Sequence, residues 1–489
     1  MRWVRPLLVT AGLAFAAVQV IAWPVAIAAQ DEASYLAGAY ILRHGTVFAD
    51  VAQVPLLWSV PHAGHTALLY PPGQSALLAP FTFGGWRLAF TANLLAHLTG
   101  FLLFSILLKQ LGIRRAWALL YLFFPPLVLY SRTLMSDVPS AALIVAVLLV
   151  WLWGPWGRAL AGALLGASLF LRYANLLTFI FLALAAGLGD LAALRRRTGG
   201  GWQIFRLPPL VAGFLPLCAL FVVYNLVVYG HPTTPGYASV GQFGLRHLPG
   251  HLAVYGTVLM LIYPLMLLAP LVYRGRLQVE VLVVSYGVLL AQSAYYFLNT
   301  YGSLPERAFV GSRLLFPAVP LFLVAYAQGL DRVVDRTYSR LKSVVPVVAG
   351  GLLLLGILAT LFVSNLHQQR LQQAAQARAV IERTAPRPAL HLINGETAKF
   401  LNPAWGNRQY QVLIGQDLLA VPPQPETGRP IAVIYTAHGA DTPDLVTARA
   451  VAARYNARLM TDWRGEWHVM VWVTSVDDFS DALAGSAHG

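Results

Sequence analysis

The chain has 489 residues, of which 57% are hydrophobic and only 11% are charged. A soluble domain carries about a quarter charged residues, so this composition excludes an ordinary soluble protein and indicates a polytopic membrane protein. The single cysteine, Cys218, excludes an intrachain disulfide and a cysteine-based metal site, and the net charge of +14 comes from short arginine clusters between apolar runs rather than from a nucleic-acid-binding groove.

Apolar runs that are long enough to cross a bilayer recur along the first three quarters of the chain. We predict eleven membrane spans, at 7–29, 87–108, 116–130, 137–153, 158–171, 175–190, 208–229, 251–273, 279–298, 312–330 and 343–363. The first run resembles a signal peptide, but its length favours an uncleaved helix. Basic residues concentrate in alternate loops, which predicts an inner (plasma) membrane protein with a cytoplasmic N-terminus and an extracytoplasmic C-terminus.

From about residue 365 the composition becomes more polar. A helical pattern from Leu445 to Ala457 lies among four short apolar segments, which are Leu390–Ile393, Gln411–Ile414, Ile431–Tyr435 and His468–Val473. This alternation is typical of a small α/β domain. We therefore predict a mainly α transmembrane module over 1–364, with an extracytoplasmic first loop at about 30–86, and a soluble extracytoplasmic α/β domain over 365–489.

An acidic pair, Asp31-Glu32, follows the first apolar run directly. The chain has only 20 Asp and Glu residues, and carboxylates at a membrane surface cost desolvation unless they serve a purpose. Asp31 could act as a general base that deprotonates an acceptor hydroxyl, with Glu32 as its orienting neighbour. Asp31 could instead be the N-cap of a helix whose apolar face begins at Tyr35. The two roles are compatible, because a cap would fix the position of the carboxylate.

Other polar candidates lie in loops on the same predicted side of the membrane. Asp137 starts a span just before Pro139, where it could cap the helix or orient a substrate, and Arg132 could pair with it. Arg313, Arg172 and Arg132 are candidates for binding a phosphate. Arg313 could instead extend its side chain along the apolar surface to the membrane interface.

The first loop also contains His62 and His65, followed by the turn Tyr70-Pro71-Pro72-Gly73, and we regard these residues as a possible substrate loop. The two histidines could ligate a divalent metal beside the acidic pair. Loop histidines are far more often simple polar residues. We therefore expect no metal site and no required cofactor, with a divalent metal as the lesser alternative.

Together these motifs resemble the GT-C superfamily of integral membrane glycosyltransferases, and most of all the branch with protein O-mannosyltransferases and bacterial aminoarabinose transferases. The similarity covers about residues 1–340, and the segment beyond 365 has no motif that we can assign. The matching motifs, in chain order, are Asp31-Glu32, Tyr70-Pro71-Pro72-Gly73, Ser136-Asp137-Val138-Pro139 and Ser312-Arg313-Leu314-Leu315-Phe316-Pro317.

The resemblance implies an inverting glycosyltransferase that moves a hexosyl or pentosyl group from a polyprenyl-phosphate donor to an acceptor hydroxyl outside the membrane. Asp31 would be the general base, Glu32 its neighbour and Asp137 a second acidic residue of the site. Arg313 would bind the donor phosphate, an assignment that rests on its chemistry. The implied partners are the lipid-linked donor, a lipid, glycan or protein acceptor, and the bilayer, without nucleic acid.

Two other functions stay open from the sequence. A multi-pass lipid or glycan transporter or flippase would carry charged residues within its spans, or inverted repeats. A non-catalytic envelope-assembly protein would use the C-terminal segment for interactions, and Asp31 and Asp137 would be dispensable in it.

Overall fold

The computed structural model places most of the chain in two compact units. One unit comprises residues 1–23, 71–77 and 90–365, and the other comprises 24–70, 78–89 and 366–489. Most of the first loop, except residues 71–77, therefore belongs to the same unit as the C-terminal segment. The residues that the structure describes are 4–27, 29–49, 59–62, 65–195, 205–232, 242–297, 311–337, 344–385, 389–401, 409–412, 430–439 and 442–474.

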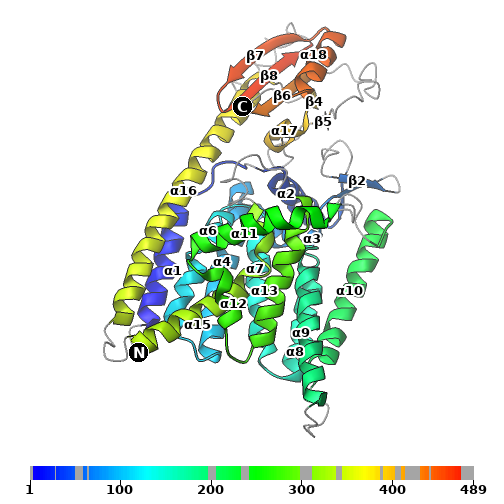
Figure 1. Cartoon of the computed structure of the whole chain (residues 1–489). Coiled ribbons are helices and arrows are strands. Elements are labelled where there is room, and N and C mark those ends of the chain that lie inside the picture. Colours follow the sequence, from blue (N-terminus) through cyan, green and yellow to red (C-terminus); the bar gives the residue numbers. More distant parts are fainter. Residues whose placement is uncertain are drawn as a thin grey trace. The chain divides into compact units, whose positions relative to one another are not determined.

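The first unit is a bundle of apolar helices (Figure 1). A helix pairs its own backbone N–H and C=O groups, and lipid tails offer no hydrogen-bonding partners for them. The helices are α1 (Val4–Ile21), α3 (Pro72–Leu78), α4 (Phe90–Gln110), α5 (Leu119–Leu122), α6 (Pro125–Tyr130), α7 (Asp137–Trp151), α8 (Pro155–Ser168), α9 (Asn175–Arg195), α10 (Leu207–Tyr229), α11 (Leu248–Ile262), α12 (Ala269–Val272), α13 (Gln278–Ser293), α15 (Val319–Thr337) and α16 (Val344–Thr384). The last of these continues into the second unit.

The helices confirm a mainly α, polytopic membrane protein, although they do not confirm eleven spans. Within the described residues, five helices are long and apolar enough to cross a membrane, and the bent pair formed by 245–262 and 266–272 is a sixth candidate. The predicted third span, 116–130, is divided into the 3-10 helix Arg115–Ala118, α5 and α6. This break occurs because prolines at the start of α6 cannot continue the preceding helix.

The basic residues at one end of the bundle are paired with scarce carboxylates. Arg114 forms an ion pair of 2.7 Å with Asp331, and Arg206 forms one of 2.6 Å with the buried Glu280. The indole of Trp151 also donates to Glu280, at 3.2 Å. These ion pairs stabilise the bundle at loops that the sequence predicts to be cytoplasmic.

Two helices of this bundle, α8 and α10, approach each other closely through small residues. A Cβ atom at Gly162 would lie 2.0 Å from the carbonyl oxygen of Leu210, and one at Gly213 would lie 1.8 Å from that of Ala159. In a bilayer the hydrophobic effect does not drive helices together, because lipid tails are themselves apolar. Close backbone packing of this kind therefore promotes helix association. Glycine is therefore required at both positions.

Among its described residues, the second unit contains α2 (Gln30–Arg43), the last part of α16, two sheets, and the helices α17 (Gly395–Ala398) and α18 (Asp444–Arg454) (Figure 1). The small sheet is antiparallel, with the order β1-β3-β2, and consists of β1 (Phe48–Ala49), β2 (Ser59–His62) and β3 (His65–Leu68). The larger sheet has the order β5-β4-β6-β8-β7 and consists of β4 (Leu390–Ile393), β5 (Gln409–Val412), β6 (Ile431–His438), β7 (Arg458–Arg464) and β8 (Trp467–Val473).

The larger sheet is mixed and packs against α18. Strand β4 pairs in parallel with β5 and β6, whereas β8 is antiparallel to β6 and β7. The core between sheet and helix contains Leu392, Val433, Tyr435, Val451 and Trp472. The sequence pattern identified β4, β6, β8 and α18, but it missed β7, whose side chains are mostly exposed at the sheet edge.

We predict that Gly213→Ala destabilises the protein, because the new methyl group would overlap the backbone of α8. Overpacking of this kind costs about 1–3 kcal/mol of unfolding free energy. The melting temperature of the purified protein in detergent should therefore fall. Gly350→Ala in α16 is the control, since nothing lies within 4 Å of a Cβ atom there. Equal melting temperatures for the two variants would contradict the close contact.

Candidate active site

The acidic pair lies in the first turn of α2, and its two carboxylates have different environments. Glu32 is only 2% exposed, and its Oε1 accepts a hydrogen bond of 3.2 Å from the backbone N–H of Ala29. The positive end of the helix also favours acidic residues at this turn. Glu32, and not Asp31, is therefore the carboxylate that caps α2, and the helix starts at Gln30, five residues before the expected apolar face.

Asp31 is partly exposed and is oriented by the predicted substrate turn. The hydroxyl of Tyr70 donates a hydrogen bond of 2.7 Å to its Oδ1. The ring of Tyr70 lies against that of Tyr35 on α2, with 4.9 Å between the ring centroids. These contacts fix the direction of the Asp31 carboxylate while leaving it accessible from solvent, which a general base requires.

In the helical unit, two buried amides that the sequence analysis missed hold the loop before Asp137. The side-chain nitrogen of Asn93 on α4 donates to the carbonyl oxygens of Thr133 and Met135, at 2.7 Å each. Gln74 on α3 donates to Asn93 at 3.1 Å and to the carbonyl of Leu134 at 2.9 Å. Both amides are 0% exposed. Polar residues within otherwise apolar helices were the available sequence signal for them.

Asp137 begins α7 and forms a buried ion pair with Arg172, which precedes α9. Their side chains are 2% and 5% exposed. The segment before Arg172 is itself fixed, because the N–H of Gly73 donates to the carbonyl of Phe170 at 2.6 Å. The structure therefore brings together two residues that the sequence analysis considered separately, and it gives Asp137 a partner other than the expected Arg132.

Arg132 contacts the end of α1 instead. Its guanidinium donates to Gln19 at 3.0 Å and to the carbonyl oxygen of Ala22 at 2.5 Å. The chain turns directly after α6, with the N–H of Arg132 donating to the carbonyl of Leu129, so this side chain is directed towards α1. Its contacts indicate that Arg132 joins α1 to the loop before Asp137.

Arg313 lies in the 3-10 helix Gly311–Leu315 and is half-buried. Its guanidinium carbon lies 5.2 Å from the ring centroid of Phe297. In the same segment, Phe316 packs edge-on against Tyr130, with 5.5 Å between the centroids. The segment of Arg313 therefore packs against the end of α6, after which the chain continues through the loop to Asp137.

The proposed histidine ligands are placed only by their backbones. Strands β2 and β3 set His62 opposite His65, and the side chains of both lie outside the described residues. Arg307, in the loop before Arg313, lies outside them as well. No group of three or more metal-ligating side chains occurs in the part of the chain that the structure describes. The absence of a metal requirement stays a prediction.

We predict that Arg172→Leu destabilises the protein strongly, because it leaves the carboxylate of Asp137 buried without its cation. Breaking a buried pair in this way costs about 3–5 kcal/mol of unfolding free energy. The double variant Arg172→Leu/Asp137→Asn removes both charges and should regain much of that loss. Thermal unfolding of the single and double variants in detergent measures the coupling. Strictly additive losses would show that the two side chains do not stabilise each other.

Comparisons with known proteins show the fold of the chain. Neither a protein-family model nor a curated protein matches it in sequence. The solved structures of ArnT from Cupriavidus metallidurans, bound to undecaprenyl phosphate and in the apo state, are both 14% identical to it, with TM-scores of 0.62. The alignments cover 95% and 94% of this chain, and 98% and 97% of ArnT.

A second solved structure agrees with the first. The arabinofuranosyltransferase AftD from Mycobacteria is 13% identical, with a TM-score of 0.51 over 98% of this chain and 40% of AftD. The chain thus spans less than half of AftD but nearly all of ArnT. Their shared architecture confirms the resemblance that the sequence motifs indicated, at the level of structure. The chain therefore shares its fold with ArnT and AftD, in agreement with the GT-C fold that the sequence motifs predicted.

Proposed function

We propose that this protein is a membrane glycosyltransferase that moves a sugar from a polyprenyl-phosphate donor to an acceptor hydroxyl, with Asp31 as the general base. The observation that carries the proposal is the division of roles within the acidic pair. Glu32 is buried and caps α2, whereas Asp31 is accessible and is held by Tyr70. The GT-C fold supports the same reaction class, because ArnT has been solved with undecaprenyl phosphate bound.

The proposed chemistry is a single displacement at the anomeric carbon of the sugar. The acceptor oxygen forms the new bond to this carbon as its proton passes to the carboxylate of Asp31. The bond between the anomeric carbon and the phosphate oxygen breaks on the opposite face, and its electron pair leaves with the polyprenyl phosphate. Inversion follows from this geometry. The reaction needs no nucleotide, since the lipid delivers the donor from the bilayer.

The departing phosphate gains negative charge, so a cation near it lowers the barrier. We propose Arg313 for this role, because its guanidinium is half-buried and already rests on an aromatic ring. Arg172 is neutralised by Asp137. We assign this pair to shaping the donor site rather than to carrying the phosphate charge alone, and we assign Arg132 to supporting the same loop.

The membrane topology and the substrates belong to the proposal as well. The distribution of basic residues supports a cytoplasmic N-terminus and a transfer reaction at the outer face of the inner membrane. The acceptor hydroxyl belongs to a lipid, a glycan or a protein. The transferred group is a hexose or a pentose.

We predict that Asp31→Asn abolishes transfer and leaves folding intact, because it removes the base at constant side-chain size. The measurement is transfer of label from a panel of radiolabelled polyprenyl-phosphate sugars by the purified protein in nanodiscs. Asp462→Asn makes the same change at an exposed position on β7 and should keep full activity. Near-normal turnover of Asp31→Asn would refute the mechanism. Movement of intact donor across the bilayer without transfer would favour a flippase instead.

We also predict that the transfer rate does not change after treatment with EDTA, because the proposed mechanism uses a carboxylate base and arginine and no Lewis acid. The rate should be the same when Mg²⁺ or Mn²⁺ is then added back. A rate that falls with EDTA and returns with one of these ions would show that a metal takes part, with His62 and His65 as the first candidates for mutation.

A further inference from the structure

Lys399, which the sequence analysis did not consider, lies in a cluster of charged side chains with Glu396 and Glu32. Lysine is rare in this chain, with only Lys109, Lys342 and Lys399 against a large number of arginines. Lys399 lies in the 3-10 helix Lys399–Leu401, directly after α17. Its side chain is 4% exposed. A buried lysine in a chain that otherwise uses arginine indicates a site where a compact ammonium group is needed.

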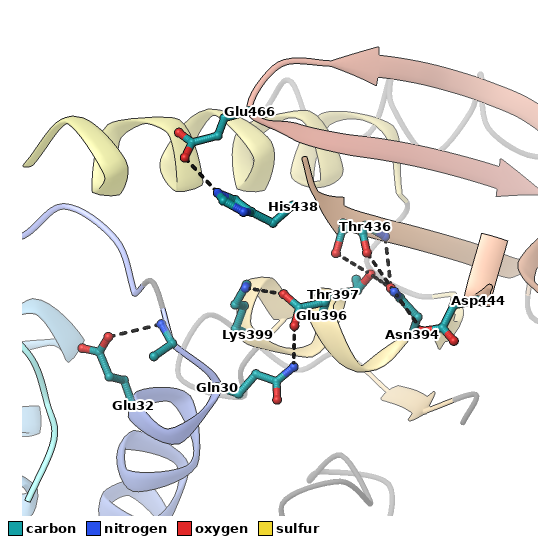
Figure 2. A network of polar contacts seen from close by, with 11 residues as sticks. Gln30, Glu32, Asn394, Glu396, Thr397, Lys399, Thr436, His438, Asp444 and Glu466 are labelled. Atoms are coloured by element: carbon teal, nitrogen blue, oxygen red, sulfur yellow. Dashed lines mark hydrogen bonds and ion pairs between the residues drawn. The ribbon is translucent and has the colours of Figure 1, made fainter. Parts of the chain in front are cut away.

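The position of Lys399 is fixed by the larger sheet, just beyond the end of β4, whose last residue Ile393 lies opposite Ile434 of β6; Figure 2 shows the polar contacts there. Asn394 follows β4 and exchanges two hydrogen bonds with the backbone of Thr436 on β6, at 2.8 and 3.0 Å. The hydroxyl of Thr397 donates to Asn394 at 2.6 Å. These bonds anchor α17 on a rigid element, so the side chains that leave α17 have defined directions.

Two carboxylates from different segments surround the ammonium group. Its Nζ lies 2.6 Å from Oε2 of Glu396, and Glu32 on α2 also acts on it electrostatically. On the remaining side, Nζ lies 3.9 Å from the ring centroid of Trp467 on β8, a cation–π contact. Burial lowers the pKa of Lys399, while Glu396 and then Glu32 oppose this effect. Glu396 and Glu32, the second of which lies on α2, thus offset the unfavourable burial of the Lys399 ammonium group.

Glu396 makes a second connection to the same turn. Its Oε1 accepts a hydrogen bond of 2.9 Å from the side chain of Gln30, while its Oε2 accepts from Lys399. Gln30 and Glu32 are the residues on either side of Asp31. When both neighbours are held, the backbone of Asp31 is held as well, and its carboxylate can meet Tyr70 in one geometry.

The far end of α2 is held independently of this cluster. Arg43 donates to the carbonyl oxygen of Thr82 at 3.0 Å, and its guanidinium lies 4.0 Å from the ring centroid of Phe83. Loss of the Lys399 cluster should therefore release the first turn of α2 and leave its last turn in place. This difference allows a local effect to be separated from general unfolding.

We infer that Lys399, together with Glu396, is a positioning residue that holds the first turn of α2 and thereby aims the Asp31 carboxylate at the acceptor. The inference rests on the proposed function for its catalytic consequence. It gives the C-terminal α/β segment a part in the transfer step, through the position of Asp31. Misplacement of a catalytic group by about 1 Å can lower a rate about 100-fold, so a loosened turn should reduce kcat.

The experiment compares Lys399→Met and Gln30→Ala with wild type in nanodiscs. Hydrogen exchange of the amides at 30–36 should rise in both variants, with 39–43 unchanged. The value of kcat per folded enzyme should fall about 10- to 100-fold in Lys399→Met, with the donor KM nearly unchanged. Arg449→Met, which removes an exposed cation from α18, is the matched control and should leave both readouts at the wild-type level.

The pH dependence of kcat separates positioning by a charged Lys399 from a purely structural role of this residue, which would leave the pH profile unchanged. Deprotonation of Lys399 removes the positive charge between Glu396 on α17 and Glu32 on α2, the charged groups that face it among the described residues. Trp467 on β8 and Phe400 face the ammonium group with uncharged aromatic rings. Because burial lowers the pKa of Lys399, wild-type kcat should fall as the pH rises towards the alkaline range. Lys399→Met should lack this alkaline decrease.

The outcomes separate failure of the inference about Lys399 from failure of the proposed function. Unchanged exchange at 30–36 would overturn the inference, and so would raised exchange with wild-type kcat. If the wild type transfers no sugar but exchange at 30–36 rises in the variants, the proposed function is overturned. The conclusion that Lys399 and Glu396 hold the first turn of α2 is then still supported. If exchange at 431–438 shows that Lys399→Met disrupts the sheet, Gln30→Ala decides the question, since it changes α2 alone.

Discussion

A carboxylate that is withdrawn from water must be matched by a cation or by hydrogen-bond donors, and this requirement organises the whole molecule. Asp137 is buried against Arg172, and Glu280 is buried against Arg206. Glu32 accepts from a backbone N–H at the start of α2. Asp31 differs from these residues because it keeps partial exposure. Among the described residues, the fold uses Asp137, Glu280 and Glu32 for stability, and it leaves Asp31 in a state suited to chemistry.

Much of the candidate site could be predicted because its residues are unusual in their surroundings. An acidic pair after an apolar run and an aspartate at the start of a span are visible without a structure. Their division of labour is not visible, because Asp31 and Glu32 are chemically alike in the sequence. Only the folded backbone shows which carboxylate reaches the N–H of Ala29. Likewise, Arg172 and Arg132 were equivalent candidates until the loop before Asp137 turned Arg132 towards α1.

The elements that sequence reasoning missed depend on contacts between distant segments. Asn93 and Gln74 are ordinary amides until the loop 130–136 folds over them. Hydropathy also treats 116–130 as one apolar run, although prolines divide it into separate helices. The importance of Lys399 was invisible for the same reason, because its role comes from a turn of the chain more than three hundred residues earlier.

The contact between Gln30 and Glu396 joins residues that are 366 positions apart. During synthesis, Gln30 leaves the ribosome 366 residues before Glu396, so the first turn of α2 gains this contact only after the intervening chain has been made. Contacts of such sequence separation form late, because the intervening chain must be ordered first. A chain that stops before β4 would lack this contact with α2, so the candidate site depends on the segment that contains α17.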